Sequence, residues 1–307
     1  MTLPDHVSTH DAPEDVRNEN ILIYVDGNLV PREQAVVSVY DSGFMLGDGV
    51  WEGMRIYDGH IAFMDDHIDR LLEAALYIDL EIGKTREELV KAIHDTLAAN
   101  GMTNDAHIRM MVTRGKKRKP FQHPQLSVFG STIVIIAEHS KPDDSVIDRG
   151  IRLHTVPHHR GLPLTQDSKL NSHSKLNCII ALNHALRAGA DEALMLDPFG
   201  FVNTTNACNF FIVKKGQVWT STGDYCMNGI TRQKVIDLCR ANDIPVFERN
   251  FSLVDTYSAD EVFLTGTFGA QTPVFEIDGR VIGGANAGPV FHKIRELYKD
   301  LILQDAK

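Results

Sequence analysis

The pattern of hydrophobic and polar residues predicts short strands joined by tight turns near the start of the chain. Apolar runs flank an Asp-Gly pair at 26–27 and another at 58–59, which is the sequence signature of a β-hairpin. The strands predicted from these runs lie at 21–25, 28–30, 35–40, 54–56 and 61–63.

Two longer segments have apolar residues three and four positions apart, which predicts amphipathic helices at 65–78 and 85–99. Thr85 is the expected N-cap of the second helix, and Glu88 stands where a capping box requires an acid. Strands at 107–113 and 132–137 complete this part of the chain.

A polar, turn-rich stretch at 139–150 separates this part from a second one that carries more strand than helix. There we predict strands at 151–156, 192–196, 209–213, 245–249 and 261–265, a hairpin at 278–279, and helices at 174–187, 231–241 and from 289 onward. The expected protein is therefore of the α/β (α+β) class, with a flexible arm (1–20), a small N-terminal domain (21–138), a linker (139–150) and a larger C-terminal domain (151–307).

The net charge of the chain limits the kinds of molecule that it is expected to bind. The 307 residues include 31 Lys and Arg against 41 Asp and Glu, a net charge of −10, which argues against nucleic acid or an anionic membrane as partner. Apolar runs have strand length and the first twenty residues are polar, so we expect a cytoplasmic protein without a membrane span. Four separated cysteines without a Cys-x-x-Cys pair argue against disulfides or a metal cluster.

Four short segments suit a phosphorylated, electrophilic cofactor. Residues 228–231 open a helix whose N–H groups, with the Thr231 hydroxyl, can bind an anion, and residues 264–267 end a strand in a Thr-Gly-Thr turn. Arg70 lies on a helix, and Lys169 lies in a polar loop where a lysine can form a Schiff base with an aldehyde. Taken alone, these segments are better explained in structural terms. Thr231 would be a helix cap, residues 264–267 a turn, Arg70 a solvated arginine and Lys169 a surface lysine.

The order and spacing of these segments resemble the class IV pyridoxal-phosphate aminotransferases, the family of branched-chain and D-amino acid aminotransferases and aminodeoxychorismate lyase. The resemblance runs from about residue 21 to the C-terminus. Its motifs are YDSGF (40–44), GDGVWEGMR (47–55), HIDRL (67–71), GADEALMLD (189–197), NFF (209–211), GITR (229–232), ADEVF (259–263), TGT (265–267) and GP (288–289).

This resemblance implies fold type IV, with a small N-terminal α/β domain, a larger C-terminal pseudobarrel domain and pyridoxal 5′-phosphate between them. It also implies an obligate homodimer whose partner subunit contributes to the active site. No metal is implied.

The resemblance implies that Lys169 carries the cofactor and moves the substrate's Cα proton, because it lies 20 residues before Gly189. Lys175 is the competitor, 14 residues before Gly189, and fits better beside the phenolic oxygen of the cofactor. His173 is an equal candidate for that second place.

The other implied contacts surround the phosphate and the substrate. Trp51 suggests an apolar substrate pocket, Arg109 matches an arginine that reads a second carboxylate, and Phe268 lies in a turn that faces the substrate carboxylate. The positions that match the phosphate cup are Arg70, Gly229, Ile230, Thr231, Gly266 and Thr267.

Two departures from the family pattern change these expectations. Thr204 stands where the family has a Glu that bonds the pyridine nitrogen, so stabilisation of a carbanion is expected to be weaker. The basic loop RGKKRK (114–119) places Lys117 and Arg118 where D-amino acid relatives hold the substrate carboxylate, but it lacks their Arg-x-His pattern. A solvated basic loop is the favoured interpretation, and a loop that captures a carboxylate in the partner's site is the alternative.

The resemblance thus predicts transfer of an amino group between an amino acid and a 2-keto acid, with branched-chain-like substrates. Three alternatives remain open: a D-amino acid or (R)-amine transaminase, a lyase similar to aminodeoxychorismate lyase, and a non-catalytic sensor of the cofactor or a metabolite.

Overall fold

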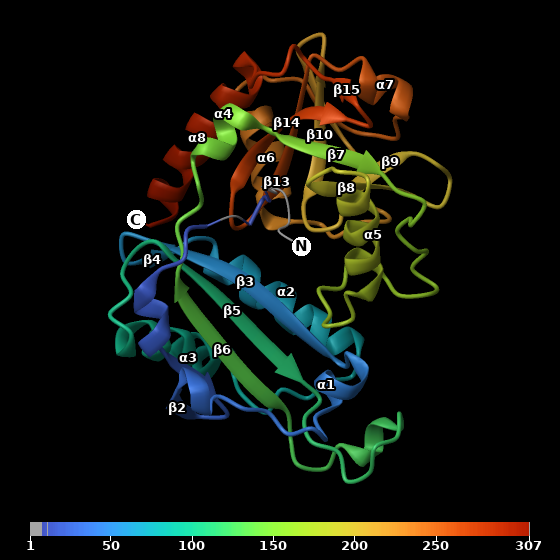
Figure 1. Ribbon diagram of the computed structural model, residues 1–307. Helices are drawn as coiled ribbons and strands as arrows, with labels where there is room; N and C mark the ends of the chain where they lie inside the picture. The colour runs from blue at the N-terminus through green and yellow to red at the C-terminus, as the bar shows by residue number, and fades with distance from the viewer. Residues whose placement is uncertain (1–7, 11, 307) are drawn as a thin grey trace.

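The computed structural model describes residues 8–10 and 12–306, which form two β-sheets with helices packed against them (Figure 1). The first sheet has six strands in the order β2-β1-β6-β5-β3-β4, and all of its described pairings are antiparallel. Its strands are β1 (Leu22–Val25), β2 (Asn28–Pro31), β3 (Gly49–Tyr57), β4 (His60–Ile61), β5 (Ala106–Thr113) and β6 (Thr132–His139).

Helices α2 (Met64–Tyr77) and α3 (Arg86–Ala99) pack on the first sheet and share one apolar core with it. Their helical spacing places Ile68 and Leu89 in this core, where both are fully buried. The Thr85 hydroxyl and the Glu88 carboxylate form the expected capping box at the start of α3. Short elements complete this part: α1 (Ser42–Leu46) and the 3-10 turns η1 (Val16–Asn20), η2 (Arg32–Gln34) and η3 (Pro124–Leu126).

The second sheet has nine strands, of which eight follow the order β12-β11-β10-β13-β14-β7-β8-β9 and β15 pairs with β14. β9 pairs with both β8 and β10, so the strands between them close into a barrel-like ring, as expected for the C-terminal part. The strands are β7 (Ile151–Thr155), β8 (Glu192–Leu196), β9 (Val202–Thr205), β10 (Asn209–Lys214), β11 (Gln217–Thr220), β12 (Val246–Glu248), β13 (Glu261–Gly266), β14 (Ala270–Ile277) and β15 (Arg280–Val281).

Five helices belong to this second part of the chain. Figure 1 shows α5 beside β8 and shows α8 running along the other side of the sheet, near the point where β6 leads into α4. The helices are α4 (Ser145–Arg149), α5 (Leu176–Arg187), α6 (Ile230–Ala241), α7 (Leu253–Tyr257) and α8 (Pro289–Asp305). The two-part α/β fold expected from the sequence is confirmed.

Three local expectations were wrong. Residues 35–40 form no strand, because no neighbouring strand pairs with them, and Val36 and Val39 are exposed. The stretch 139–150 is not only linker, since it contains α4. The segment 1–20 is not loose throughout: Thr9 is buried, and its N–H donates to the Glu192 carboxylate at 3.0 Å.

No helix in the described residues is long and apolar enough to cross a membrane.

Candidate active site

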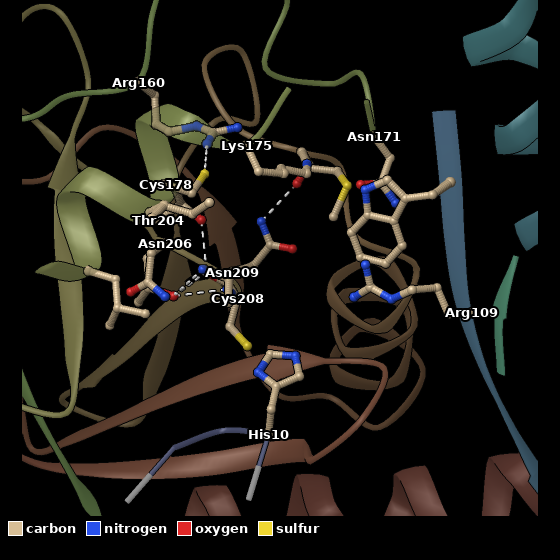
Figure 2. A pocket seen from close by; sticks show the side chains of 16 residues that line it. His10, Arg109, Arg160, Asn171, Lys175, Cys178, Thr204, Asn206, Cys208 and Asn209 are labelled. Atoms are coloured by element: carbon tan, nitrogen blue, oxygen red, sulfur yellow. Dashed lines mark hydrogen bonds between the residues drawn. The ribbon is translucent and has the colours of Figure 1, made fainter. Parts of the chain in front are cut away.

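A cavity of about 340 Å³ lies between the two parts of the chain, within the size range of small-molecule sites. Figure 2 shows the side chains that surround it. A smaller hollow shares Trp51, Arg109, Asn171 and Asn209 with this cavity and reaches the start of α6. We call the two together the central cavity.

The wall of the central cavity is positively charged. Arg70, Arg109, Arg160 and Lys175 line it, and none of its described lining residues is acidic. His107 of the wall adds little positive charge, because burial, with Arg109 nearby, lowers its pKa to about 3. The site is therefore built for an anionic ligand.

The start of α6 forms a cup at one end of this cavity. Gly229 is the N-cap and no side chain caps the first turn, so backbone N–H groups there can bind an anion. Thr231 is buried in this turn, and the Thr265 hydroxyl opposite is buried without a hydrogen-bond partner. An anion in the cup would satisfy these donors.

Glycines make this cup tight. A Cβ atom on Gly229 would lie 2.2 Å from Oδ1 of Asn209, and one on Gly266 would lie 2.9 Å from Sγ of Cys208. Both glycines were predicted at the phosphate-binding positions, and both line the hollow together with Ile230 and Thr267. A side chain at either position would collide with these neighbouring side chains, so the backbone can come this close only as glycine.

Arg70 is held at the rim of the cup by a buried carboxylate. Its Nε and Nη2 atoms donate to Glu52 at 2.8 and 2.7 Å, and its Nη1 atom donates to the Asn228 carbonyl at 3.2 Å. Nδ1 of His67 lies 2.7 Å from the same carboxylate. Burial alone would raise the pKa of Glu52, but Arg70 and His67 bring it below its ordinary value, so the carboxylate stays charged.

The loop before α5 decides which lysine faces the cavity. Residues 171–173 pair with β3: the Trp51 N–H donates to Asn171, and the His173 N–H donates to Gly49. Beyond this fixed segment, Lys175 enters the cavity wall, with Nζ 5.6 Å from the centre of the Trp51 ring.

Lys169 lies before the fixed segment and does not reach the cavity. Its backbone N–H donates to the Asp167 carboxylate in a turn, and its side chain is exposed. The sequence-based preference for Lys169 is not supported by this placement. Burial lowers the pKa of Lys175 to about 8, which makes a neutral amine accessible near neutral pH.

Of the two candidates for the place beside the phenolic oxygen, only Lys175 lines the central cavity. His173 lies on the loop next to it, with Nε2 buried and without a hydrogen-bond partner, and burial lowers its pKa.

Trp51 and Arg109 form one wall of the cavity, as predicted. The Arg109 guanidinium lies 4.1 Å from the centre of the Trp51 ring, and the indole N–H donates to the Ser172 carbonyl at 3.1 Å. Both residues come from neighbouring strands, β3 and β5, which pair in register along their full length.

Phe268 closes another side of the cavity, next to a segment that the sequence analysis treated as a loose arm. The His10 ring stacks on Phe268 with centroids 5.9 Å apart, and Figure 2 shows His10 directed at the cavity. Thr9 fixes this segment on Glu192.

Thr204 lines the cavity, but its hydroxyl is already used. It donates to the Cys208 carbonyl at 2.8 Å, within a buried wall that continues through Thr205 and Asn206. None of these three residues is charged. The buried Glu192 carboxylate lies next to this wall, where its Oε2 accepts from the Thr205 hydroxyl at 3.4 Å, and it does not line the central cavity.

The basic loop does not reach this chain's own cavity. Lys117 is buried elsewhere and donates from Nζ to the His123 carbonyl at 3.1 Å, while Arg118 is exposed. Lys117 is therefore not a solvated or ligand-seeking side chain here, contrary to the expectation. A contact of Arg118 with a partner subunit stays a prediction.

The sequence did not reveal several residues that line the cavity or hold its side chains in place. Glu52 lies inside a quoted motif, and its position 18 residues before Arg70 carried no sign of their pairing. Arg160 and Asn171 lie in an irregular loop, where each has a buried polar atom without a partner. Only the folded chain places these residues at one site.

Comparison with known proteins adds an independent result. The model of the amino-transferase class IV family matches residues 49–277. A branched-chain-amino-acid aminotransferase-like protein 2 of Arabidopsis thaliana is 43% identical over 92% of this chain and 51% of its own length, so the chain spans about half of that relative. A D-alanine aminotransferase of Listeria monocytogenes is 33% identical over 92% of this chain and 96% of its own length.

A solved structure agrees with the fold. The branched-chain amino acid aminotransferase of the organism abbreviated T.th., with pyridoxamine 5′-phosphate, is 30% identical, covers 93% of this chain and 95% of its own, and has a TM-score of 0.87. With the family match over most of the chain, these findings show that the chain belongs to the class IV aminotransferase family.

Proposed function

We propose that this protein is a pyridoxal-phosphate-dependent aminotransferase that moves an amino group between an amino acid and a 2-keto acid. One observation carries the proposal: a half-buried lysine and a helix N-terminus without a side-chain cap face one cavity whose other charges are arginines. The helix N-terminus suits the phosphate ester of a cofactor, and the lysine suits its aldehyde. The arginines suit substrates with carboxylates.

The residues present fit the cofactor. The first turn of α6, Thr231, Thr265 and Arg70 would hold the phosphate, and the space beside Gly229 and Gly266 would admit it. When bound, the cofactor supplies an aldehyde that accepts an amino group and a ring that withdraws electrons from the substrate Cα. Thr204 at the cavity wall stays neutral, so it holds no proton for that ring.

Lys175, in place of Lys169, is the lysine that we assign to the cofactor. Its side chain is in the cavity and its pKa of about 8 allows the amine to lose its proton near neutral pH. The same amine can then take a proton from the substrate Cα and return it to another atom of the bound substrate and cofactor. Trp51 and Arg109 would hold the substrate on the side of the cavity where Lys175 lies.

The substrates we propose are branched-chain-like amino acids, with a 2-keto dicarboxylate as acceptor. The Trp51 ring and Phe268 offer apolar surface to a branched side chain, and Arg109 at the mouth can bind a second carboxylate. D-Amino acids are the second candidate, supported by the match to a D-alanine aminotransferase along nearly its whole length.

A substrate panel tests this function. The cofactor-loaded protein is mixed with L-leucine, D-alanine or an (R)-amine and with 2-oxoglutarate, and the new amino acid is measured by chiral chromatography. We expect transfer from L-leucine. Transfer from D-alanine alone would select the second candidate. Release of pyruvate from added aminodeoxychorismate, without transfer of an amino group to 2-oxoglutarate, would indicate a lyase. No turnover with any of these compounds would indicate a sensor.

Arg109→Gln is expected to raise the KM for 2-oxoglutarate about 10- to 100-fold, because a charge-assisted hydrogen bond contributes about 1.5–3 kcal/mol. The KM for pyruvate, which has one carboxylate, should stay near its original value. Arg280→Gln is the control, since Arg280 is exposed on β15 and does not line the central cavity. Equal changes for both keto acids would contradict the assigned role.

We also propose a cytoplasmic homodimer. Val36, Val39, Phe44, Phe121 and Phe129 are exposed, on two segments joined by hydrogen bonds between Tyr40 and Lys117 and between Ser42 and Gly115. We call these five side chains the apolar rim. Exposed apolar surface of this kind commonly marks a protein interface, and a second copy of the chain would cover it.

The double change Val36→Asp and Phe44→Asp is expected to convert the dimer into a monomer, measured as mass by sedimentation or light scattering. Val254→Asp is the control, because Val254 is equally exposed but lies on α7. A wild-type protein that sediments as a monomer at all concentrations would rule out the dimer.

A further inference from the structure

A second cavity, of about 180 Å³, lies where the two parts of the chain and the segment between them meet. It shares no lining residue with the central cavity. We call it the junction cavity. Its main polar residues are Arg55 and Tyr57 of β3, Asp105 before β5, Gln271 of β14, and Arg295 and Tyr298 of α8.

Gln271 is the first sign that this cavity takes a ligand. The residue is fully buried, and neither Oε1 nor Nε2 of its side chain has a hydrogen-bond partner. A buried amide without partners costs about 1–3 kcal/mol for each unsatisfied group, so native proteins rarely keep one without a use. A ligand at this end of the cavity would pair it.

Arg55 is the second sign. Its side chain is buried and donates only to neutral oxygens, the Tyr57 hydroxyl at 3.2 Å and the Phe268 carbonyl at 2.9 Å, and its Nε atom has no partner. No carboxylate among the described residues pairs with it. A buried guanidinium is normally paired with an anion, and Arg55 lacks such a partner among the described residues.

The remaining charges also favour an anion. Arg55, Arg295, Lys141 and Lys299 line the cavity against Asp105 and Asp144, an excess of two positive charges by 4 − 2. Asp144 is already bound to Arg295 at 3.1 Å, and Lys141 and Lys299 are exposed at the mouth. A planar guanidinium group can form two parallel hydrogen bonds with a planar carboxylate, which a spherical anion does not allow. The two arginines therefore favour carboxylates.

We propose that the junction cavity binds a small dicarboxylate as an effector, in addition to the substrates of the central cavity. One carboxylate would pair with Arg55 and the amide of Gln271, and the other with Arg295 and the lysines at the mouth. Such a ligand joins β3 of the first part to β14 and α8 of the second.

The junction cavity is also connected to the cup. The Tyr298 hydroxyl donates to Thr231 at 3.4 Å, and Arg55 donates to the carbonyl of Phe268, the residue after Thr267. A dicarboxylate that shifts Arg55 or Tyr298 therefore acts on side chains that touch the phosphate site. Binding should change the affinity for the phosphorylated cofactor.

Succinate binding to the cofactor-loaded protein, measured by calorimetry and by the melting temperature, tests the proposal. Arg109→Gln weakens succinate binding in the central cavity, which Arg160 and Lys175 also line. Succinate binding that is kept in this variant and weakened by a change at Gln271 therefore belongs to the junction cavity. Gln271→Met keeps the side-chain length and removes both amide atoms. We expect it to weaken succinate binding about tenfold while the melting temperature without succinate stays equal or rises.

Gln125→Met is the matched control, because Gln125 is exposed outside this cavity. If Gln271→Met does not fold, Lys299→Gln at the exposed mouth should still weaken binding several-fold. Unchanged succinate affinity in the Gln271 or Lys299 variant, loss of all binding in Arg109→Gln, or tighter binding of inorganic phosphate than of succinate would each overturn the proposal.

Discussion

Lys175→Ala is expected to abolish covalent capture of pyridoxal 5′-phosphate and to lower kcat by at least about 10³-fold, because one side chain serves as both nucleophile and base. The measurement is reduction with borohydride followed by peptide mass mapping, together with the visible absorbance of the loaded protein. The modified peptide should contain Lys175 in the wild-type protein.

Lys169→Ala is the matched control, since Lys169 is an exposed lysine six positions earlier on the same loop. It should retain both capture and turnover. If instead the label is found on Lys169, and Lys175→Ala still captures the cofactor, the spacing argument from the sequence is correct and the assignment from the cavity is wrong.

The same lysine sets the pH dependence of capture. With a pKa of about 8, well below the ordinary value of 10.5, about a tenth of Lys175 is neutral at pH 7. The capture rate should therefore rise with pH and level off above about 8. A rate that keeps rising to pH 10 would indicate an ordinary exposed lysine.

Arg70→Ala is expected to lower both the cofactor affinity and the free energy of unfolding. Arg70 is 16% exposed and Glu52 is fully buried, so the change leaves a buried carboxylate with only His67 beside it. Removing one partner of a buried ion pair typically costs about 3–5 kcal/mol. Urea unfolding of the protein without cofactor measures the loss of unfolding free energy. Equilibrium binding of pyridoxal 5′-phosphate measures the loss of cofactor affinity.

Two further variants separate these effects. Arg86→Ala removes an arginine that pairs with Asp65 and Asp69 on the surface, and it should cost less than about 1 kcal/mol. Adding Glu52→Gln to Arg70→Ala removes the unpaired charge, so stability should recover while cofactor affinity stays low. Recovery of both would mean that Arg70 does not bind the phosphate.

Elements with strong local signals could be predicted from the sequence. Thr85 and Glu88 are three residues apart, and each side chain bonds to the backbone of the other residue. The Asp-Gly pairs at 26–27 and 58–59 form tight turns through their own backbone conformation and need no distant contact. Residues 35–40 have the same β-branched composition as true strands, but a strand also needs a partner, which the sequence does not reveal. The short strand β9 lacks an alternating pattern because all four of its residues are buried, so both of its faces are covered.

Some residues of the candidate site could likewise be predicted from the sequence, and others could not. Gly229, Thr231 and Gly266 were predictable, because a tight anion cup demands particular residues at particular backbone positions. The direction of Lys175 was not, because it follows from the pairing of residues 171–173 with β3, a contact between segments 121 positions apart. Gln271 and Arg55 carry no motif, and only their burial makes them unusual.

The bond from Thr9 to Glu192 has a consequence for the order in which the protein is made. These residues are 183 positions apart, so Thr9 leaves the ribosome long before its partner exists. His10, which completes one side of the central cavity, cannot dock until β8 has been synthesised and paired. A ribosome-bound chain that ends before β8 should therefore hold a folded first sheet and an open, ligand-free cavity wall.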